Sequence, residues 1–358
     1  LIVSGLLDDE TSADIFTYSR NLYSTLEEET GLATGFKSIG YLQIACDTER
    51  LEEMRRSAAF MRNFGIDCHE IGLEEARSHW PNAKWDDVIG AFYTAEDGRA
   101  NPVDVTMSLA KGFRQRGGTL VEGVRVTDVL EQQGQVTAVV TDHGTVETQF
   151  VVNCAGMWAR QFGELAGVSL PLQAAEHYYL ITEDMPGMTP TTPVLEDPDR
   201  YAYFREEVGG MMIGLFEPEA APWNLDRIPD DFSFGEIEPD WERMIPFLES
   251  AYERVPEAKN LGIRKFFCGP ESFTPDLAPL VGEAPELRNY FVACGMNSLG
   301  ILSGGGIGRI LAHWIVNGQP DVDVTGINVN RFHGCQASQH YLGDRLVEVL
   351  GKMYEPHY

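Results

Sequence analysis

The feature that most constrains this chain is a glycine-rich segment between an apolar run and a helical pattern. Residues 289–308 carry no charge, and six of these 20 residues are glycines. The length would allow a membrane span, but this glycine content, with Asn297 among it, would leave backbone groups poorly satisfied in lipid. The pattern instead predicts a buried strand at 290–293, a glycine-rich turn and a helix at 307–316. Close helix packing explains one or two of the glycines, so we expect a ligand at the start of this helix.

Hydrophobic periodicity predicts both helices and strands along the rest of the chain. The clearest helix, 102–116, starts after Asn101, has Pro102 in its first turn and stops at Gly117. Residues 119–156 change to a period of two, which predicts a meander that leads into one buried strand and turns at Gly156 into a helix. The other predicted helices cover 14–30, 48–64, 157–166 and 238–255, and a further strand covers 40–45.

Charge and cysteine content limit the classes of partner. The chain has 358 residues, of which 55 are acidic and 27 basic, giving a net charge of −28 without a dense basic patch. Binding to phosphate backbones needs clustered Lys and Arg, so we expect no nucleic-acid partner. The six cysteines are scattered singly, which favours a reducing, cytoplasmic compartment. His333, Cys335 and His340 form the one close cluster of ligand types, and we expect no metal site there.

Several common functional motifs are absent. The chain has no Gly-x-Ser-x-Gly, no His-Glu-x-x-His and no phosphate-binding P-loop sequence. Hydrolase and P-loop nucleotidase chemistry is therefore not indicated. A Gly-x-Gly-x-x-Gly motif between a strand and a helix is missing as well. The length suggests two domains.

Four motifs spread over the chain read VNCAGMWA at 152–159, EHYY at 176–179, GPESFTPD at 269–276 and a glycine-rich run ending in LAHWI at 295–315. Together they resemble the FAD-dependent dimethylglycine and sarcosine dehydrogenase family, within the D-amino-acid-oxidase-like flavoproteins. The resemblance extends over essentially the whole chain. The EHYY motif and residues 295–298 look most similar to the branch that contains the pyruvate dehydrogenase phosphatase regulatory subunit, whose members need not be catalysts.

The resemblance implies a two-domain FAD-binding fold of the α/β plus α+β class. Family members open with a Rossmann βαβ unit that grips the FAD pyrophosphate, and many carry C-terminal folate-binding domains. Neither is present here, so we expect a fragment that lacks the first βαβ unit. The implied FAD-binding domain is discontinuous and incomplete, the substrate domain lies between its segments, and a connector follows. These parts cover 1–35, 96–170 and 276–318 for FAD, 36–95 and 171–275 for substrate, and 319–358 for the connector.

The resemblance also implies which residues contact the cofactor. The backbone of Val126 corresponds to a position that meets the adenine, and the turn after the buried strand lies beside FAD. The glycine-rich loop would wrap the isoalloxazine, with backbone donors near the pyrimidine carbonyl that stabilise negative charge on the reduced ring. The cofactor-binding residues implied in this way are Val126, Ala155, Gly156, Trp158, Gly295, Met296, Gly300, Ile301 and Leu302.

The implied chemistry is oxidation of a secondary or tertiary amine, such as dimethylglycine or sarcosine, by hydride transfer to flavin N5. His177 and Tyr203 match family positions that face the flavin, where they would orient the amine or take up its proton. Arg205 lies two residues from Tyr203, hence on the same strand face, and is a candidate for binding a substrate carboxylate. The electron acceptor stays open. The alternative function is a catalytically silent regulatory or scaffold subunit.

Overall fold

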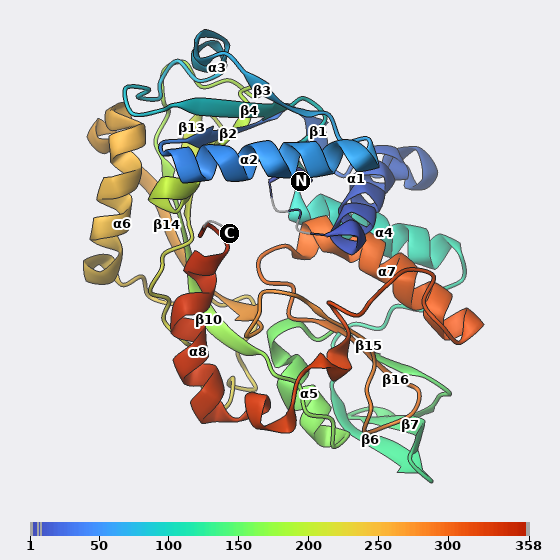
Figure 1. Ribbon diagram of the computed structural model, residues 1–358. Helices are drawn as coiled ribbons and strands as arrows, with labels where there is room; N and C mark the ends of the chain where they lie inside the picture. The colour runs from blue at the N-terminus through green and yellow to red at the C-terminus, as the bar shows by residue number, and fades with distance from the viewer. Residues whose placement is uncertain (1–2, 6, 8, 356–358) are drawn as a thin grey trace.

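The computed structural model describes residues 3–5, 7 and 9–355, and its largest unit is an eight-stranded mixed sheet (Figure 1). The strands come from two separate stretches of the chain, which meet where β11 and β2 pair in parallel. All other neighbouring strands in this sheet are antiparallel. In spatial order the strands are β14 (Ile263–Phe273), β10 (Gln173–Thr182), β13 (Gly210–Leu215), β12 (Ala202–Glu207), β11 (Val194–Asp197), β2 (Tyr41–Ala45), β4 (Gly90–Thr94) and β3 (Cys68–Ile71).

One face of this sheet packs into the main hydrophobic core. Successive strand residues point to opposite faces, so Tyr178 and Leu180 of β10 are fully buried in this core while His177 and Tyr179 point the other way. Helix α6 (Trp241–Arg254) covers the core face and lies along the left of Figure 1. The short helix α3 (Leu73–His79) adds an alanine to the same core. The opposite face is therefore left for the functional residues.

The second half of the molecule holds two smaller sheets and the helices that pack beside them. The central strand β16 (Tyr290–Cys294) pairs in parallel with β9 (Val151–Asn153) and antiparallel with β15 (Leu280–Glu283). Helix α1 (Glu10–Thr30) contacts both α4 (Pro102–Gln115) and α7 (Gly300–Asn317), at the right of Figure 1. The predicted meander is confirmed: β6 (Val126–Gln132), β7 (Gln135–Thr141) and β8 (Gly144–Glu147) form an antiparallel sheet, followed by β9 and α5 (Ala159–Leu165).

The chain passes between the two halves through short paired strands and packed helices. In the sequence, β1 (Lys37–Ser38) comes before β2, β3 and β4, and β5 (Gly98–Arg99) comes after them. The strands β1 and β5 pair with each other where the chain enters and leaves this part of the large sheet. Helix α2 (Thr48–Met61) shares a hydrophobic cluster with α1, α7 and Phe92 of β4. The substrate and FAD domain boundaries drawn from the sequence remain an interpretation of this arrangement.

Helix α7 begins earlier than the sequence pattern predicts. We expected a glycine-rich turn before a helix at 307–316, but the helix already begins at Gly300. A Cβ atom at Gly306 would lie 2.5 Å from the Cα atom of Ile15 in α1, and the Gly306 amide donates a hydrogen bond to the Ser19 hydroxyl at 2.9 Å. Some of the glycines therefore let two helices approach closely, because any larger residue would collide with the α1 backbone.

The stretch expected as a connector contains a packed helix, α8 (Gln339–Lys352). Leu346, Val349 and Leu350 are fully buried in a small cluster with Ala175 of β10 and Phe273 of β14, whereas Val347 is exposed. The helix therefore rests against the end of the large sheet. The apolar residues of α8 have helical spacing, but the polar residues around them led to the prediction of a connector instead of a helix. The buried residues are Leu342, Leu346, Val349 and Leu350.

Candidate active site

The face of the large sheet opposite the core brings the two predicted catalytic residues together. Tyr203 of β12 lies opposite Gly214 of β13, which lies opposite Tyr179 of β10, and Tyr179 lies opposite Phe267 of β14. These four residues form one row across the sheet. His177 is one two-residue step away along β10, so its side chain is on the same face.

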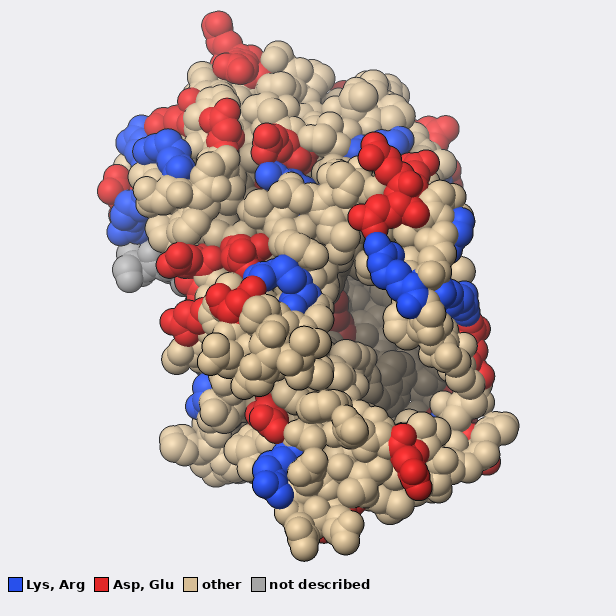
Figure 2. Space-filling model, turned by 90° about the vertical axis from the view of Figure 1, so that its right-hand side faces the viewer, with Lys and Arg blue, Asp and Glu red and all other residues tan. Residues whose placement is uncertain are grey.

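This face borders a cavity of about 530 Å³. His177 and Tyr203 both line it, together with Trp158, which follows β9, and Ser298, which precedes α7. Residues from the large sheet therefore meet two of the segments that the sequence assigns to the cofactor. The other lining side chains are mainly aromatic, with Glu271 as the one carboxylate among the lining residues. On the side of the molecule that carries α1, α4 and α7, Figure 2 shows a deep hollow whose visible interior is largely uncharged.

His177 is held by packing on one side and faces a carboxylate on the other. Its ring packs against Phe216, with the ring centroids 4.8 Å apart. Its Nε2 atom lies 3.9 Å from a carboxylate oxygen of Glu271, and 13% of the side chain is exposed. The Nδ1 atom is buried and has no hydrogen-bond partner within the described part of the chain. The Nε2 atom is therefore the one placed to exchange a proton with a molecule in the cavity.

The Tyr203 ring lies directly over Gly214. A Cβ atom at Gly214 would lie 2.0 Å from the Tyr203 ring, so this packing requires glycine at that position. Burial is the main cause that raises the pKa of the Tyr203 phenol above its ordinary value, and the charge of Glu271 adds to it, against a lowering by Arg205. The hydroxyl is therefore protonated at neutral pH and can donate a hydrogen bond.

Arg205 is on the same strand but is not among the cavity-lining residues. Its guanidinium pairs with Glu207 at 2.6 Å, and both side chains are about one-quarter exposed. Tyr203 is two residues before Arg205 on β12, so both side chains are on the same face and Tyr203 is the one that lines the cavity. A role for Arg205 in binding a substrate carboxylate stays a prediction.

The loop before α7 has an unusual backbone conformation. Gly295, Asn297 and Ser298 all have positive φ, at 65°, 50° and 66°. The buried Asn297 side chain fixes the loop by accepting from the Thr274 amide at 2.8 Å and donating to the Gly295 carbonyl at 2.7 Å. Non-glycine residues with positive φ are strained and persist where the surrounding structure holds them.

The first turn of α7 leaves donors free. The helix has no side-chain N-cap. Within the described residues, the amides of Gly300, Ile301 and Leu302 have no hydrogen-bond acceptor. A helix start of this kind presents positive potential to an electron-rich atom. Met296 is half-buried and lines a second cavity of about 440 Å³.

The turn after β9 is the other segment that the sequence assigns to the cofactor. The Asn153 side chain accepts a hydrogen bond from the Ala155 amide at 3.1 Å and donates to the Ala159 carbonyl at 2.9 Å. Gly156 has φ of 56° and nothing within 4 Å of the place of a Cβ atom, so the backbone there is open to a ligand. Val126 is half-buried at the start of β6.

Sequence reasoning assigned no role to several buried or cavity-lining acids, among them Glu271 and Glu196. Glu271 lies in the GPESFTPD motif, which carried the resemblance, yet no role was assigned to it. Glu196 is 1% exposed and lines the second cavity. It accepts a hydrogen bond from Gln43 at 2.9 Å, and burial is the main cause that raises its pKa to about 7. The sequence of a short strand such as β11 does not indicate that one of its acidic side chains is buried.

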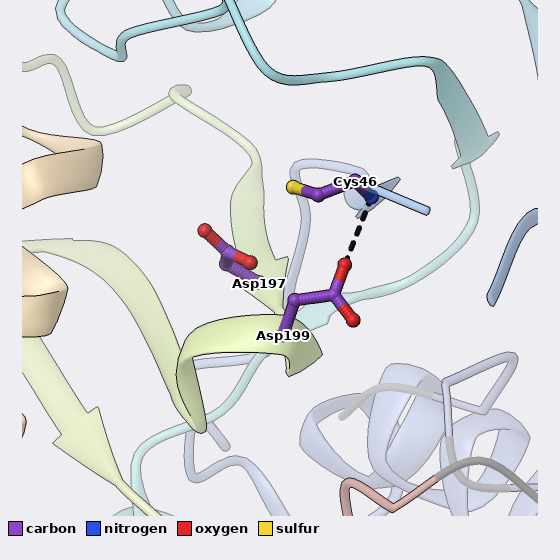
Figure 3. Close-up of side chains that lie close together, drawn as sticks. All are labelled: Cys46, Asp197 and Asp199. Carbon is purple, nitrogen blue, oxygen red and sulfur yellow. Dashed lines mark hydrogen bonds between the residues drawn. The ribbon is translucent and has the colours of Figure 1, made fainter. Parts of the chain in front are cut away.

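A cluster of potential metal ligands is satisfied by arginines. Among the described residues, Cys46, Asp197 and Asp199 lie close enough to share an ion (Figure 3). However, Arg254 donates to Asp197 at 2.6 Å and to the Cys46 sulfur at 3.2 Å. Arg50 pairs with Asp199 at 3.4 Å, and burial raises the pKa of the Cys46 thiol to about 12. A protonated thiol and paired carboxylates do not suit a cation.

Two family models match the chain. Residues 1–314 match the family described as FAD dependent oxidoreductase, and residues 317–358 match the FAD dependent oxidoreductase central domain. The chain belongs to the FAD dependent oxidoreductase family. FAD is the cofactor of this family, and the mixed α/β fold of the D-amino-acid-oxidase type is confirmed.

The relatives agree with the resemblance seen in the motifs. The chain is 38% identical to mitochondrial sarcosine dehydrogenase of Mus musculus over 98% of its own length, and 36% identical to the mitochondrial pyruvate dehydrogenase phosphatase regulatory subunit of Mus musculus over 99%. It spans only 38% and 40% of the lengths of these two proteins. The crystal structure of L-proline dehydrogenase from P. horikoshii is similar with a TM-score of 0.81 at 25% identity, covering 92% of this chain and 85% of that one. Among the described residues, none of the helices has the length and apolar character needed to cross a membrane.

Proposed function

We propose that this chain forms the flavin and substrate site of an amine-oxidising FAD enzyme that acts on an N-methyl amine. The observation that carries the proposal is the shared cavity: His177 and Tyr203 line it together with Trp158 and Ser298, which belong to the segments assigned to the cofactor. Catalysis needs acid–base groups and the redox cofactor to meet at one place.

The residues present fit FAD. Free amides at the start of α7 suit the electron-rich pyrimidine edge of a flavin, and the open backbone at Gly156 allows a close approach. Trp158 and Ser298 would bound the ring next to the cavity, and Val126 would meet the adenine. When bound, FAD would supply a two-electron acceptor for the hydride that leaves the N-methyl carbon.

The cavity chemistry suits a methylated amine. Tyr179 and Phe267 are stacked with their ring centroids 4.6 Å apart, and Phe232 and Tyr203 add further ring surface. Aromatic faces attract methylated ammonium groups, and the Glu271 carboxylate adds a negative charge close to His177. An amine therefore enters as a cation and is held by rings and a carboxylate.

The two predicted catalytic residues would have separate tasks. Hydride loss from the methyl carbon needs the nitrogen lone pair, so the ammonium has to lose its proton first. His177 would accept that proton at Nε2, and the protonated Tyr203 hydroxyl would orient the amine by a hydrogen bond. Aromatic walls would exclude water from the reacting atoms.

The test uses the full-length protein loaded with FAD. Under anaerobic conditions, sarcosine or dimethylglycine at millimolar concentration should bleach the flavin absorbance. The similarity to the phosphatase regulatory subunit favours a second candidate, a flavoprotein without catalytic activity. Tightly bound flavin that no N-methyl amine reduces would support that candidate and overturn the proposal.

A further inference from the structure

Glu217, which follows β13, is a buried carboxylate next to the candidate active site. Its side chain has no exposed surface. One carboxylate oxygen, Oε1, accepts from Arg243 of α6 at 2.8 Å. The other, Oε2, is buried without a hydrogen-bond partner among the described residues. An unpaired carboxylate oxygen in such a place is costly unless something else compensates it.

His177 has a ring nitrogen that likewise lacks a partner. Its Nδ1 atom is also buried without a partner within the described chain. Phe216 packs against the His177 ring, and Glu217 is the next residue along the chain. Burial raises the pKa of the Glu217 carboxyl, and the charge of His177 is the largest cause that lowers it. The two groups are not in direct contact, since Glu271 is the carboxylate within 4.0 Å of the His177 ring nitrogens among the described residues, so a bridging molecule is needed to join them.

We propose that Glu217 is a positioning residue for His177: its free carboxylate oxygen is linked to the Nδ1–H of the imidazole through one bridging water. The pair fixes the tautomer in which Nε2 carries the lone pair and faces the cavity. The inference rests on the proposed function for its role in amine oxidation, but the pairing itself needs no substrate. A carboxylate behind a histidine orients the ring and stabilises the imidazolium that forms.

Arg243 anchors the carboxylate from the core side of the sheet. It also donates to Glu176 of β10 at 3.0 Å, and the Tyr178 hydroxyl donates to the same carboxylate at 2.6 Å. The charged and titratable groups around His177 are thus Glu271 on β14, Tyr203 on β12, Glu217 after β13, and Glu176 with Arg243 behind them. Glu271 faces Nε2, so Glu217 is the carboxylate left for Nδ1.

The proposed step moves one proton from the substrate ammonium to Nε2 of His177. The N–H bond of the substrate ammonium breaks, a bond from Nε2 to that proton forms, and the positive charge moves from the amine to the imidazole. The carboxylates of Glu217 and Glu271 then stabilise the imidazolium from both sides. The neutral amine keeps the lone pair that hydride loss requires, and FAD, when bound, would supply the two-electron acceptor.

The test follows the ring nitrogens of His177 by NMR in the FAD-loaded protein across pH. The chain has eight histidines, and the signal missing in His177→Ala identifies this one. In Glu217→Gln we expect the midpoint of the His177 titration to move to lower pH by about one unit, a roughly tenfold weaker proton affinity, and the Nδ1–H tautomer to lose its dominance. Glu217→Asp keeps the charge and should shift it less.

A matched control is Glu206→Gln, because Glu206 is also buried and paired with an arginine, Arg99, at 2.7 Å on the same sheet. It should leave the His177 titration unchanged. If Glu217→Gln does not fold, Arg243→Gln provides the test, because loss of the arginine charge should move the midpoint to higher pH.

An unchanged midpoint and tautomer in the folded Glu217 variant, or an equal shift in Glu206→Gln, would overturn the proposal. If Arg243→Gln folds and Glu217→Gln does not, an unchanged midpoint of the His177 titration in Arg243→Gln would also overturn the proposal. These readouts need no turnover. A His177 shift in a protein whose flavin no amine reduces would contradict the proposed function alone.

Discussion

The two faces of the large sheet treat buried carboxylates differently. On the core face, Asp197 is paired with Arg254 and Arg200. On the cavity face, the next residue back along β11, Glu196, meets the neutral donors Gln43 and Tyr354. Glu271 on the same face is partly exposed and faces His177. Paired charges hold the fold together, whereas charges left without a cation can exchange protons. This difference separates the structural cluster around Cys46 from the candidate active site.

The largest effect is expected when the paired face loses its cation. Arg254→Ala would leave the buried Asp197 and the carboxylate of Asp87, whose pKa the two arginines hold at about 2 against burial, with Arg200 as their remaining arginine partner. We expect the free energy of unfolding to fall by about 3–5 kcal/mol in urea titrations. Arg55→Ala, at the exposed pair with Glu70, is the control and should destabilise the protein far less, because water screens that pair. Equal losses in both variants would remove the distinction.

The next prediction concerns Glu196 on the cavity face, where a substitution should raise the free energy of unfolding relative to wild type at high pH. The pKa of Glu196 is raised by burial from 4.5 to about 7, so the folded state binds this proton more tightly than the unfolded chain. Its stabilising contribution is present below about pH 4.5 and is lost as pH rises through about 7. Relative to wild type, Glu196→Gln should therefore gain about 3 kcal/mol between pH 4 and pH 8.

The measurement is the free energy of unfolding of both proteins across that range. The exposed Glu52→Gln variant should follow the wild-type pH dependence. Parallel curves for wild type and Glu196→Gln would show that Glu196 is not titrating in this window.

A smaller effect is expected from one hydroxyl in the cavity. Tyr203→Phe keeps the ring that packs over Gly214 but removes the donor to the amine. We expect the limiting rate of anaerobic flavin reduction by sarcosine to fall about tenfold, with flavin content unchanged. The exposed Tyr18→Phe variant should reduce at the wild-type rate. A wild-type rate in Tyr203→Phe would exclude a role for the hydroxyl.

The smallest effect, none, is expected from metal addition at the arginine-bound cluster. Because Arg254 and Arg50 already pair with its carboxylates, Zn²⁺ should not bind there in stoichiometric amounts. Isothermal titration of wild type against Cys46→Ser should show the same heat. Zn²⁺ binding that Cys46→Ser removes would contradict the assignment of this cluster to the fold.

Much of the fold could be predicted because local patterns determine it. The helix at 102–115 has its cap, its proline and its glycine stop in the sequence, and the meander before β9 alternates as a surface sheet should. The start of α7 could not be predicted, because Gly304, Gly305 and Gly306 favour a turn locally. Packing against Ile15 and Ser19 of α1 overrides that preference.

The candidate site was only partly visible in the sequence. The resemblance indicated His177 and Tyr203, and the register of three strands explains why they meet. Glu271 and Glu217 were not assigned, because their roles depend on which strand pairs with which. Side-chain pairing across a sheet joins residues far apart in the chain, and a single sequence does not encode that register locally.

The central claim is that the cavity face of the sheet performs proton transfer during amine oxidation, and the most direct measurement is the reductive half-reaction of His177→Ala. In the full-length, FAD-loaded protein mixed anaerobically with sarcosine or dimethylglycine, flavin reduction should slow by about ten to ten-thousandfold relative to wild type. Flavin content should stay the same, because His177 is not assigned to cofactor binding. Reduction at the wild-type rate in the folded, flavin-bound variant would contradict the account.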